Sequence, residues 1–283
     1  GLESVDMDDY GPFSGDSRII HAQSILMMII PLLWYFSEFL KTPKWKNFLL
    51  FAFCLVVILI HQHRSVWASS IFAMLVFLFA ITRNKFIAVP KIVNLVIITL
   101  TAVLVLGILV NYINPKFTNL MSDRFSEILE PTREGGTGEF RQRQREVYVA
   151  LATKRPVFGW DFEGFDMHNP LVDWWPEKSG QHFHEGYVEM LFYLGITGFL
   201  LKYWFLFYLS VKAFSKKLSR ESIILIAFSL SGLIFSFSYV LPLMFWGHVG
   251  VCLYYLERKP VEEAEELEEA TYEDQELKEL APY

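Results

Sequence analysis

The chain alternates between long apolar runs and short polar turns. Phe48–Ile60 is apolar at thirteen successive positions, and Ile92–Val110 contains only one Asn and two Thr as clearly polar residues. Because the hydrocarbon core of a bilayer is about 30 Å thick, roughly 20 mainly apolar residues cross it as a helix. These runs also lack the polar stripe of soluble surface helices. The pattern therefore predicts an all-α, polytopic membrane helix bundle with seven spans, at 19–40, 46–62, 65–82, 92–112, 187–209, 222–240 and 242–256.

Lys and Arg residues gather in the turns at 41–47, 83–91 and 210–221, and again directly after the last span. Since basic residues mark short cytoplasmic loops, these four segments are predicted on the cytoplasmic side. The turn at 61–65 and the long loop at 113–186 then face outward. The predicted organisation is an outward segment (1–18), four spans (19–112), the outward loop (113–186), three spans (187–256) and a cytoplasmic tail (257–283).

Composition changes this picture in one respect. The chain has 283 residues, of which 53% are hydrophobic and 17% aromatic, and its formal net charge is −6. The last 24 residues, Pro260–Tyr283, alone carry −9, which leaves +3 on the rest of the chain. The acidic balance disfavours a nucleic-acid partner, and Cys54 and Cys252 are too few for a disulfide scaffold. Because the chain starts on the outward side at Gly1 without a signal-like segment, we expect it to continue from a larger protein.

The outward loop at 113–186 is too long for a simple connector and is a functional candidate. Within it, Phe140–Lys154 has the periodicity of an amphipathic helix, with Phe140, Val147 and Leu151 on the apolar side. The turn that begins at Pro156 ends this helix.

Three arginines of that helix form a cluster. Arg141 and Arg145 are four residues apart and share a face, and Arg143 is offset from them. The cluster is either a solvated face that contacts anionic headgroups or a phosphate or pyrophosphate site, since guanidinium forks suit such oxygens. Trp174 and Trp175 of the same loop are expected at the membrane interface, where Trp is common.

Two further segments carry polar side chains at the predicted outer boundary. Arg64 is either a snorkelling interfacial side chain or an anion-binding group. His184 and Glu185 directly precede the fifth span, where a neutral His beside a carboxylate can act as a general base or form interfacial hydrogen bonds. Zinc is a weaker alternative, because it would require two His-x-His pairs from separate segments, namely His61, His63, His182 and His184. We predict no metal and no cofactor.

These pieces resemble one known family. His184-Glu185, followed after nine residues by Gly195-Ile196-Thr197-Gly198, resembles the His-x10-Gly-x-x-Gly signature of bacterial O-antigen ligases and related polysaccharide polymerases. Arg141–Gly159 is similar to the family's arginine-rich loop helix followed by Pro-x-x-Gly, and Arg64 matches an Arg at an outward turn between two spans. The family more often has Asn, Ser or Gln at the position of Glu185. We expect Gly195 and Gly198 to allow close approach of another helix in mid-membrane.

The resemblance covers roughly residues 48–256 and implies a metal-independent, inverting glycosyltransferase at the periplasmic face of the bacterial inner membrane. The implied donor is a glycan on undecaprenyl pyrophosphate. The implied acceptor is a lipid A core sugar for a ligase, or a second lipid-linked glycan for a polymerase. Family members usually have about twelve spans, which again predicts a longer protein.

The resemblance also implies roles for the candidate residues. Fixed positive charge near the leaving pyrophosphate lowers the barrier; the candidates are Arg64, Arg141, Arg143 and Arg145. His184 would deprotonate or orient the attacking hydroxyl, with Glu185 or Glu189 as its partner. Three tryptophans would either stack on sugar rings or anchor the loop at the membrane interface; they are Trp160, Trp174 and Trp175. Membrane lipids and the two glycan substrates are the expected partners.

Two other classes of function remain open. A transporter or channel would need polar residues near the midplane or broken helices; Lys202 and His248 lie inside predicted spans but are thin evidence for this class. A scaffold could recruit a cytoplasmic partner through the acidic tail, which is otherwise a solvated charged segment.

Overall fold

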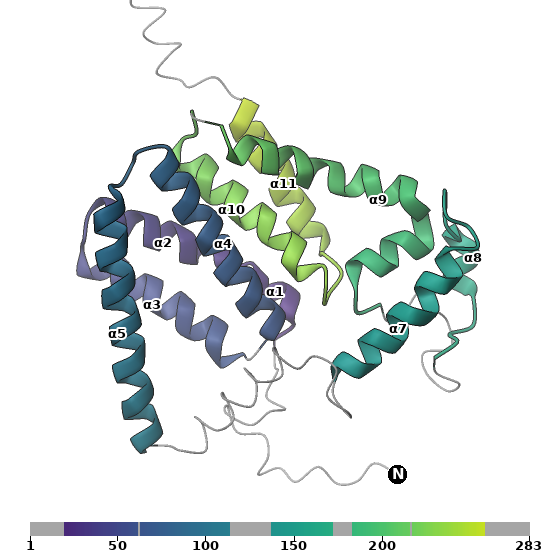
Figure 1. Ribbon diagram of the computed structural model, residues 1–283, viewed down its shortest axis with the longest axis horizontal. Helices are drawn as coiled ribbons and strands as arrows, with labels where there is room; N and C mark the ends of the chain where they lie inside the picture. Colours follow the sequence, from purple (N-terminus) through teal and green to yellow (C-terminus); the bar gives the residue numbers. More distant parts are fainter. Residues whose placement is uncertain (1–19, 62, 114–136, 172–182, 216, 258–283) are drawn as a thin grey trace, which may run out of the picture.

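The computed structural model describes residues 20–61, 63–113, 137–171, 183–215 and 217–257. All regular structure in this part of the chain is helical, with no strand, as predicted (Figure 1). The predictions for the start of the chain, for Trp174, Trp175 and His182, and for most of the acidic tail lie outside the described residues.

Helices cover each of the seven predicted apolar segments. The first half contains α1 (Ala22–Leu26), α2 (Ile29–Lys41), α3 (Trp45–Ile60), α4 (Arg64–Arg83) and α5 (Val89–Ile113). The segment between α5 and α9 contributes α7 (Thr137–Ala152) and α8 (Asp161–Asp166). The last part contains α9 (Gly186–Ala213), α10 (Arg220–Phe235) and α11 (Leu243–Glu257).

Three of the helical segments in the described residues are long and apolar enough to cross a membrane: Ala22–Lys41, Arg64–Arg83 and Gly186–Ala213. Trp45–Ile60 is a shorter apolar helix. Large apolar side chains cover the outer surfaces of these helices; Ile71 is 60% exposed and Leu201 is 68% exposed. Such surfaces suit contact with lipid. The count of seven spans stays a prediction.

Helix α10 lies at the centre of the bundle and packs against α2, α4, α9 and α11. Eleven of the sixteen residues of α10 are buried, including Ile224, Phe228 and Phe235. Ser229 and Ser231 donate their hydroxyl protons to carbonyls of the same helix. Ser236, the residue after the helix end, donates to the carbonyl of Gly232 at 2.8 Å. The buried hydroxyls are thereby satisfied without water, which lets a polar helix face stay inside the bundle.

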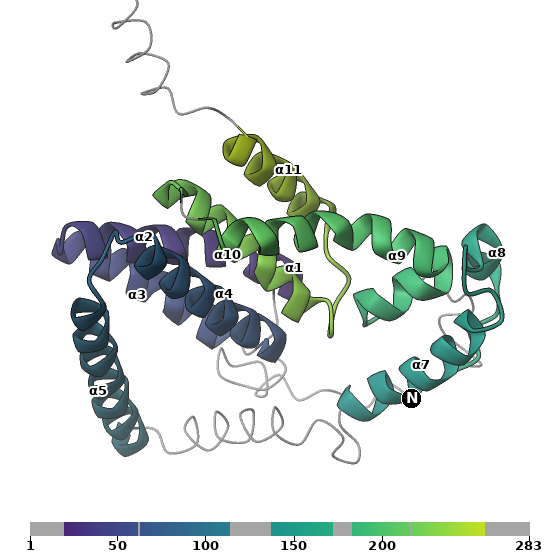
Figure 2. The ribbon, with the colours of Figure 1, turned by 45° about the horizontal axis from the view of Figure 1, so that its top comes forward.

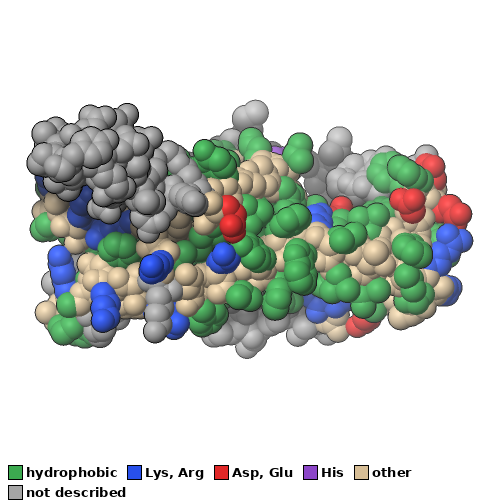
Figure 3. Space-filling model, turned by 90° about the horizontal axis from the view of Figure 1, so that it is seen from above, with side chains coloured by type: hydrophobic (Ala, Val, Ile, Leu, Met, Phe, Trp, Pro, Cys, Tyr) green, Lys and Arg blue, Asp and Glu red, His purple; other side chains and the backbone are tan. Residues whose placement is uncertain are grey.

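The basic loops that the sequence places on one side meet in the structure. Lys91 donates to the carbonyl of Leu40 at 3.0 Å, and Arg220 donates to the carbonyl of Ser37 at 3.2 Å. The amide of Leu218 donates to the side chain of Asn84 at 3.1 Å. Figure 3 shows Lys and Arg side chains concentrated toward the left end of one face, with hydrophobic side chains across its middle. The structure therefore places these basic loops on the same side of the bundle, whereas the assignment of that side to the cytoplasm stays a prediction.

At the other end of α4, a second set of contacts joins segments that are distant in sequence. His63 Nε2 lies 2.8 Å from the carbonyl oxygen of Ile20, and Gln23 donates to the carbonyl of Val240 at 2.8 Å. The amide of Gly186 donates to the carbonyl of Ser236 at 2.9 Å. In Figures 1 and 2 the starts of α4, α7 and α9 and the α10–α11 turn accordingly lie along one edge of the molecule.

Helix α9 is broken at Gly195, which has φ 61° and ψ −163°. Figures 1 and 2 show α9 as two arms joined at a bend. Gly195 does allow another segment of backbone to approach closely, but that segment is the loop turn at 157–159 and not the helix that we expected. The amides released by the break donate to a loop turn: Ile196 to Pro156 at 2.9 Å and Thr197 to Val157 at 3.1 Å. Gly198 faces the side chain of Leu194 in the same bent helix.

Candidate functional site

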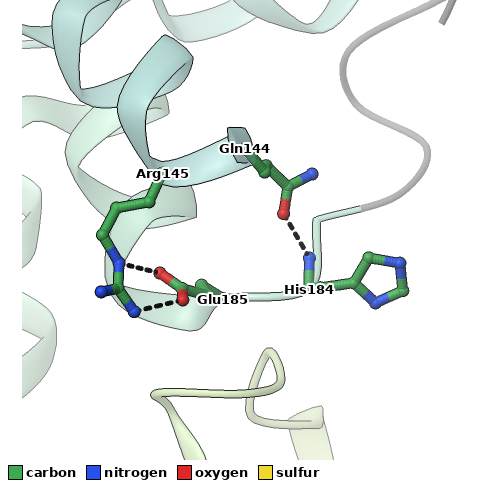
Figure 4. Close-up of polar contacts among 4 residues, drawn as sticks. All are labelled: Gln144, Arg145, His184 and Glu185. Carbon is green, nitrogen blue, oxygen red and sulfur yellow. Dashed lines mark hydrogen bonds and ion pairs between the residues drawn. The ribbon is translucent and has the colours of Figure 1, made fainter. Parts of the chain in front are cut away.

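The segment that carries His184 and Glu185 lies against helix α7. The backbone amide of His184 donates to Gln144 Oε1 at 3.1 Å. The next residue, Glu185, accepts two bonds from Arg145: Nε to Oε2 at 3.0 Å and Nη2 to Oε1 at 2.5 Å. Two successive residues of α7 thus bind the two successive residues that precede α9 (Figure 4).

Burial makes the Arg145–Glu185 pair asymmetric. The side chain of Glu185 is 4% exposed, whereas that of Arg145 is 53% exposed. A buried carboxylate requires a partner that compensates its lost hydration, and the guanidinium fork matches it at both oxygens. The hydrogen bonds to Glu185 raise the pKa of Arg145 above its ordinary value. Figure 4 shows the imidazole of His184 pointing away from this pair.

The other two arginines of α7 have different surroundings. Arg141 is half-buried, and its guanidinium lies 5.4 Å from the centre of the Tyr239 ring. A cation over an aromatic face is attracted by the ring quadrupole, so Arg141 is held beside the α10–α11 turn. Arg143 is exposed. Positive charge is therefore spread along the edge where α9 begins.

Arg64 is the first residue of α4 and is half-buried. The amino end of a helix adds the partial positive charge of its unpaired amides. His63, the residue before Arg64, contacts the carbonyl of Ile20. Gln23 of α1 contacts Val240, which is next to Tyr239, and the Tyr239 ring lies under Arg141. Arg141 therefore lies beside the α10–α11 turn, which Gln23 of α1 also contacts.

A small second core fixes α7 on the first arm of α9. Tyr148, Val188 and Phe192 are buried together, and the Tyr148 ring lies 4.6 Å from that of Phe183. The Tyr148 hydroxyl donates to Asn169 Oδ1 at 3.1 Å. Because Phe183 immediately precedes His184, this core sets the place where the His184 segment meets α7.

The buried face of α7 differs from the predicted one. The sequence suggested Val147 and Leu151, which are only partly buried, whereas Gln144 and Tyr148 are 3% and 1% exposed. Sequence reasoning missed both residues. The two residues are four positions apart, and this spacing could have indicated a shared helix face. A glutamine, however, is not expected on a buried face unless a partner for its amide is known.

A protein-family model described as O-Antigen ligase matches residues 48–203, more than half of the chain. The chain belongs to the O-antigen ligase family. No curated protein and no solved structure matches the chain. The family assignment confirms the resemblance drawn from the His184 to Gly198 stretch, and the match also spans Arg64 and all of α7.

In this O-antigen ligase family member, Trp160 is used for packing. Its indole Nε1 donates to the carbonyl of Leu151 at 2.9 Å, and its ring stacks on Phe192 with centroids 6.4 Å apart. The guanidinium of Arg155 lies 4.3 Å from the ring centre. Contact of Trp160 with a sugar stays a prediction.

The histidines considered for zinc are only partly described, since His182 lies outside the described residues. His61 Nδ1 lies 2.8 Å from the carbonyl oxygen of Val57. Within the described ranges, no group of three or more His, Cys, Asp or Glu side chains is placed to hold a metal ion.

Proposed function

We propose that the protein is a ligase that moves a glycan from undecaprenyl pyrophosphate to a sugar hydroxyl of the lipid A core, at the periplasmic face of the inner membrane. The observation that carries this proposal is the docking of the His184 segment on the arginine-bearing helix α7. Family membership supports it, because it implies lipid-linked glycans as substrates.

In the proposed reaction, the acceptor hydroxyl oxygen attacks the anomeric carbon of the donor sugar from the face opposite the pyrophosphate. The bond between that carbon and the pyrophosphate oxygen breaks, and the lipid pyrophosphate leaves with the electron pair. His184 takes the hydroxyl proton as a general base. Attack from the opposite face inverts the anomeric configuration.

Negative charge develops on the pyrophosphate as it leaves. Arginines placed beforehand near that position stabilise it more in the transition state than in the ground state. Arg64, Arg141 and Arg143 are suited to this role, because Arg64 begins α4, Arg141 lies beside the α10–α11 turn and Arg143 is exposed on α7. A metal ion is not needed for this chemistry.

An apolar groove of about 510 Å³ runs along α9. Its lining includes Tyr187, Leu191, Phe199, Tyr203, Leu233 and Phe237. Tyr187 follows His184 by three residues, and its hydroxyl donates to the carbonyl of Leu233 at 2.6 Å. We assign the prenyl chain of the donor to this groove, because its apolar wall begins next to the proposed base.

The break in α9 does not favour a transporter. In transporters, amides freed by a broken helix bind the substrate. Here the freed amides of Ile196 and Thr197 donate to carbonyls of the loop turn at 156–157. They are thus satisfied within the protein.

A deletion strain complemented with plasmid-borne variants tests the proposal. Loss of all O-antigen from lipid A, with lipid-linked polymer accumulating, is expected for a ligase. A single repeat unit left on lipid A would instead identify a polymerase. His184→Ala should fail to complement, while His168→Ala, an exposed histidine of the same loop, should complement fully. Full complementation by His184→Ala at normal membrane levels would contradict the mechanism.

A further inference from the structure

We propose that Gln144, Arg145 and Glu185 form a latch that positions His184. In this assignment Arg145 and Glu185 are positioning residues, and Arg145 does not bind pyrophosphate. The inference rests on the proposed function, in which His184 is the base.

The latch follows from the order of its contacts. Gln144 accepts from the backbone amide of His184, and Arg145 binds the side chain of the next residue, Glu185, at both oxygens (Figure 4). One contact fixes the main chain at His184, and the other fixes the direction in which the chain leaves it. Together they restrict the backbone from which the imidazole projects, while the imidazole itself points away from Glu185.

The latch is anchored on both sides. Gly186, the residue after Glu185, donates its amide to the carbonyl of Ser236 next to α10. On the other side, Tyr148 packs its buried ring against Phe183, the residue before His184. The His184 segment is therefore fixed to α7, to the second core and to the centre of the bundle. A base must be held within hydrogen-bond reach of the proton that it takes, and these contacts supply that constraint.

The same contacts separate the roles of the α7 arginines. Arg145 directs two of its N–H groups at Glu185, and the buried carboxylate compensates its charge. Losing Arg145 would leave that carboxylate buried without this partner, which is costly. An arginine held in this way has less to offer a second anion than Arg143, which is exposed on the same helix.

The first test measures the latch without catalysis. Hydrogen–deuterium exchange of the purified full chain in detergent is followed in peptides covering 183–190. Gln144→Leu and Arg145→Ala should each speed exchange at the His184 and Glu185 amides about tenfold. The matched control is Gln142→Leu, whose side chain bonds only locally to Glu146 at an exposed position of the same helix, and it should leave exchange unchanged. Unchanged exchange in both latch variants would overturn the proposal.

The second test separates positioning from binding. With donor lipid extracted from the host strain, Arg145→Ala and Glu185→Gln should lower kcat about 100-fold, since small displacements of a catalytic group have effects of this size. The KM for the donor should stay within about twofold. The charge swap Arg145→Glu with Glu185→Arg should recover most of the lost kcat. Glu163→Gln breaks an exposed ion pair of the same loop and should leave both kcat and KM unchanged.

A third test measures the binding of undecaprenyl pyrophosphate that carries no glycan. Arg145→Ala should bind this lipid as the wild type does, whereas Arg143→Ala should bind it more weakly. Equal weakening in both variants would make Arg145 a pyrophosphate ligand and overturn the latch. Normal transfer by His184→Ala would refute the proposed function instead, and the exchange data would still decide whether the latch exists.

Discussion

The backbones of Gly159 and Gly195 are in direct contact, and neither position has room for a side chain. A Cβ on Gly159 would lie 2.6 Å from the amide nitrogen of Gly195, and a Cβ on Gly195 would lie 2.7 Å from that of Gly159. Both residues have positive φ, 71° and 61°. The Pro-x-x-Gly turn after α7 and the Gly-x-x-Gly stretch of α9 thus pack directly on each other. This contact connects the loop at 113–186 to the bundle.

Substitution at this joint should destabilise the protein. Gly195→Ala places a Cβ against the carbonyl of Val157 in a conformation that L side chains rarely adopt. We expect the free energy of unfolding to fall by about 2–4 kcal/mol, from strained backbone and displaced neighbours. Thermal unfolding in detergent, followed by intrinsic fluorescence, measures this effect as a lower Tm.

Gly247→Ala is the matched control for this prediction. Gly247 lies in the α11 helix, and a Cβ there meets nothing within 4 Å. Replacing a helical glycine with alanine is neutral or stabilises by roughly 0.5–1 kcal/mol. Equal Tm values for Gly195→Ala and Gly247→Ala would show that the contact between Gly159 and Gly195 is unimportant for stability.

The positions of the helices were predictable because lipid offers no hydrogen-bond partner to the backbone, which forces long apolar runs into helices. The 65–82 prediction thus lies within Arg64–Arg83. The break in α9 was not predictable in the same way. Gly195 lies within a long apolar run, and its positive φ depends on a turn near Gly159 that is distant in sequence. Local pattern carries no information about that contact.

The candidate site shows the same division. Motif order identified His184 and the three α7 arginines, because these residue types recur in the family. Their individual surroundings depend on tertiary contacts: Glu185 binds Arg145, and Tyr239 lies under Arg141. Spacing placed the two arginines on one face but could not assign each its partner.

Arg64 should be sensitive to both charge and shape. If it binds pyrophosphate, Arg64→Ala should lower glycan transfer by about 100-fold or more, since a lost charge-assisted bond in the transition state has effects of this order. Arg64→Lys keeps the charge but loses the bidentate fork, so at most partial activity should return. Transfer assays on isolated membranes measure both variants at matched protein levels.

The control for Arg64 lies at the opposite end of the same helix. Arg83→Ala removes an arginine whose guanidinium lies 5.8 Å from the Phe214 ring centre, among the basic loops. It should leave transfer unchanged. Normal activity in Arg64→Ala, with the protein present in the membrane, would exclude Arg64 from the mechanism.

Arg143 should contribute to donor binding in a salt-dependent way. Its side chain is exposed, so its attraction for a pyrophosphate is screened by mobile ions, with a Debye length of about 10 Å at 0.1 M salt. Arg143→Ala should raise the Kd for undecaprenyl pyrophosphate about tenfold at low salt and less at high salt. Lys154→Ala, a basic residue just past the end of α7, serves as the control. A salt-independent difference, or an equal effect of Lys154→Ala, would refute a direct contact.

The groove along α9 can be tested by filling it. Leu191 lines the groove, so Leu191→Trp adds volume where the prenyl chain is proposed to lie. The affinity of the Leu191→Trp variant for undecaprenyl pyrophosphate should fall about tenfold, because the loss of roughly two buried methylene-sized contacts has this effect. Its affinity for geranyl pyrophosphate, which has the same headgroup and a short chain, should change far less. Leu200→Trp places the same indole at a position that is 60% exposed on α9 and should leave both affinities unchanged. An equal loss for the long and short lipids would place the defect at the headgroup and exclude the groove as the prenyl site.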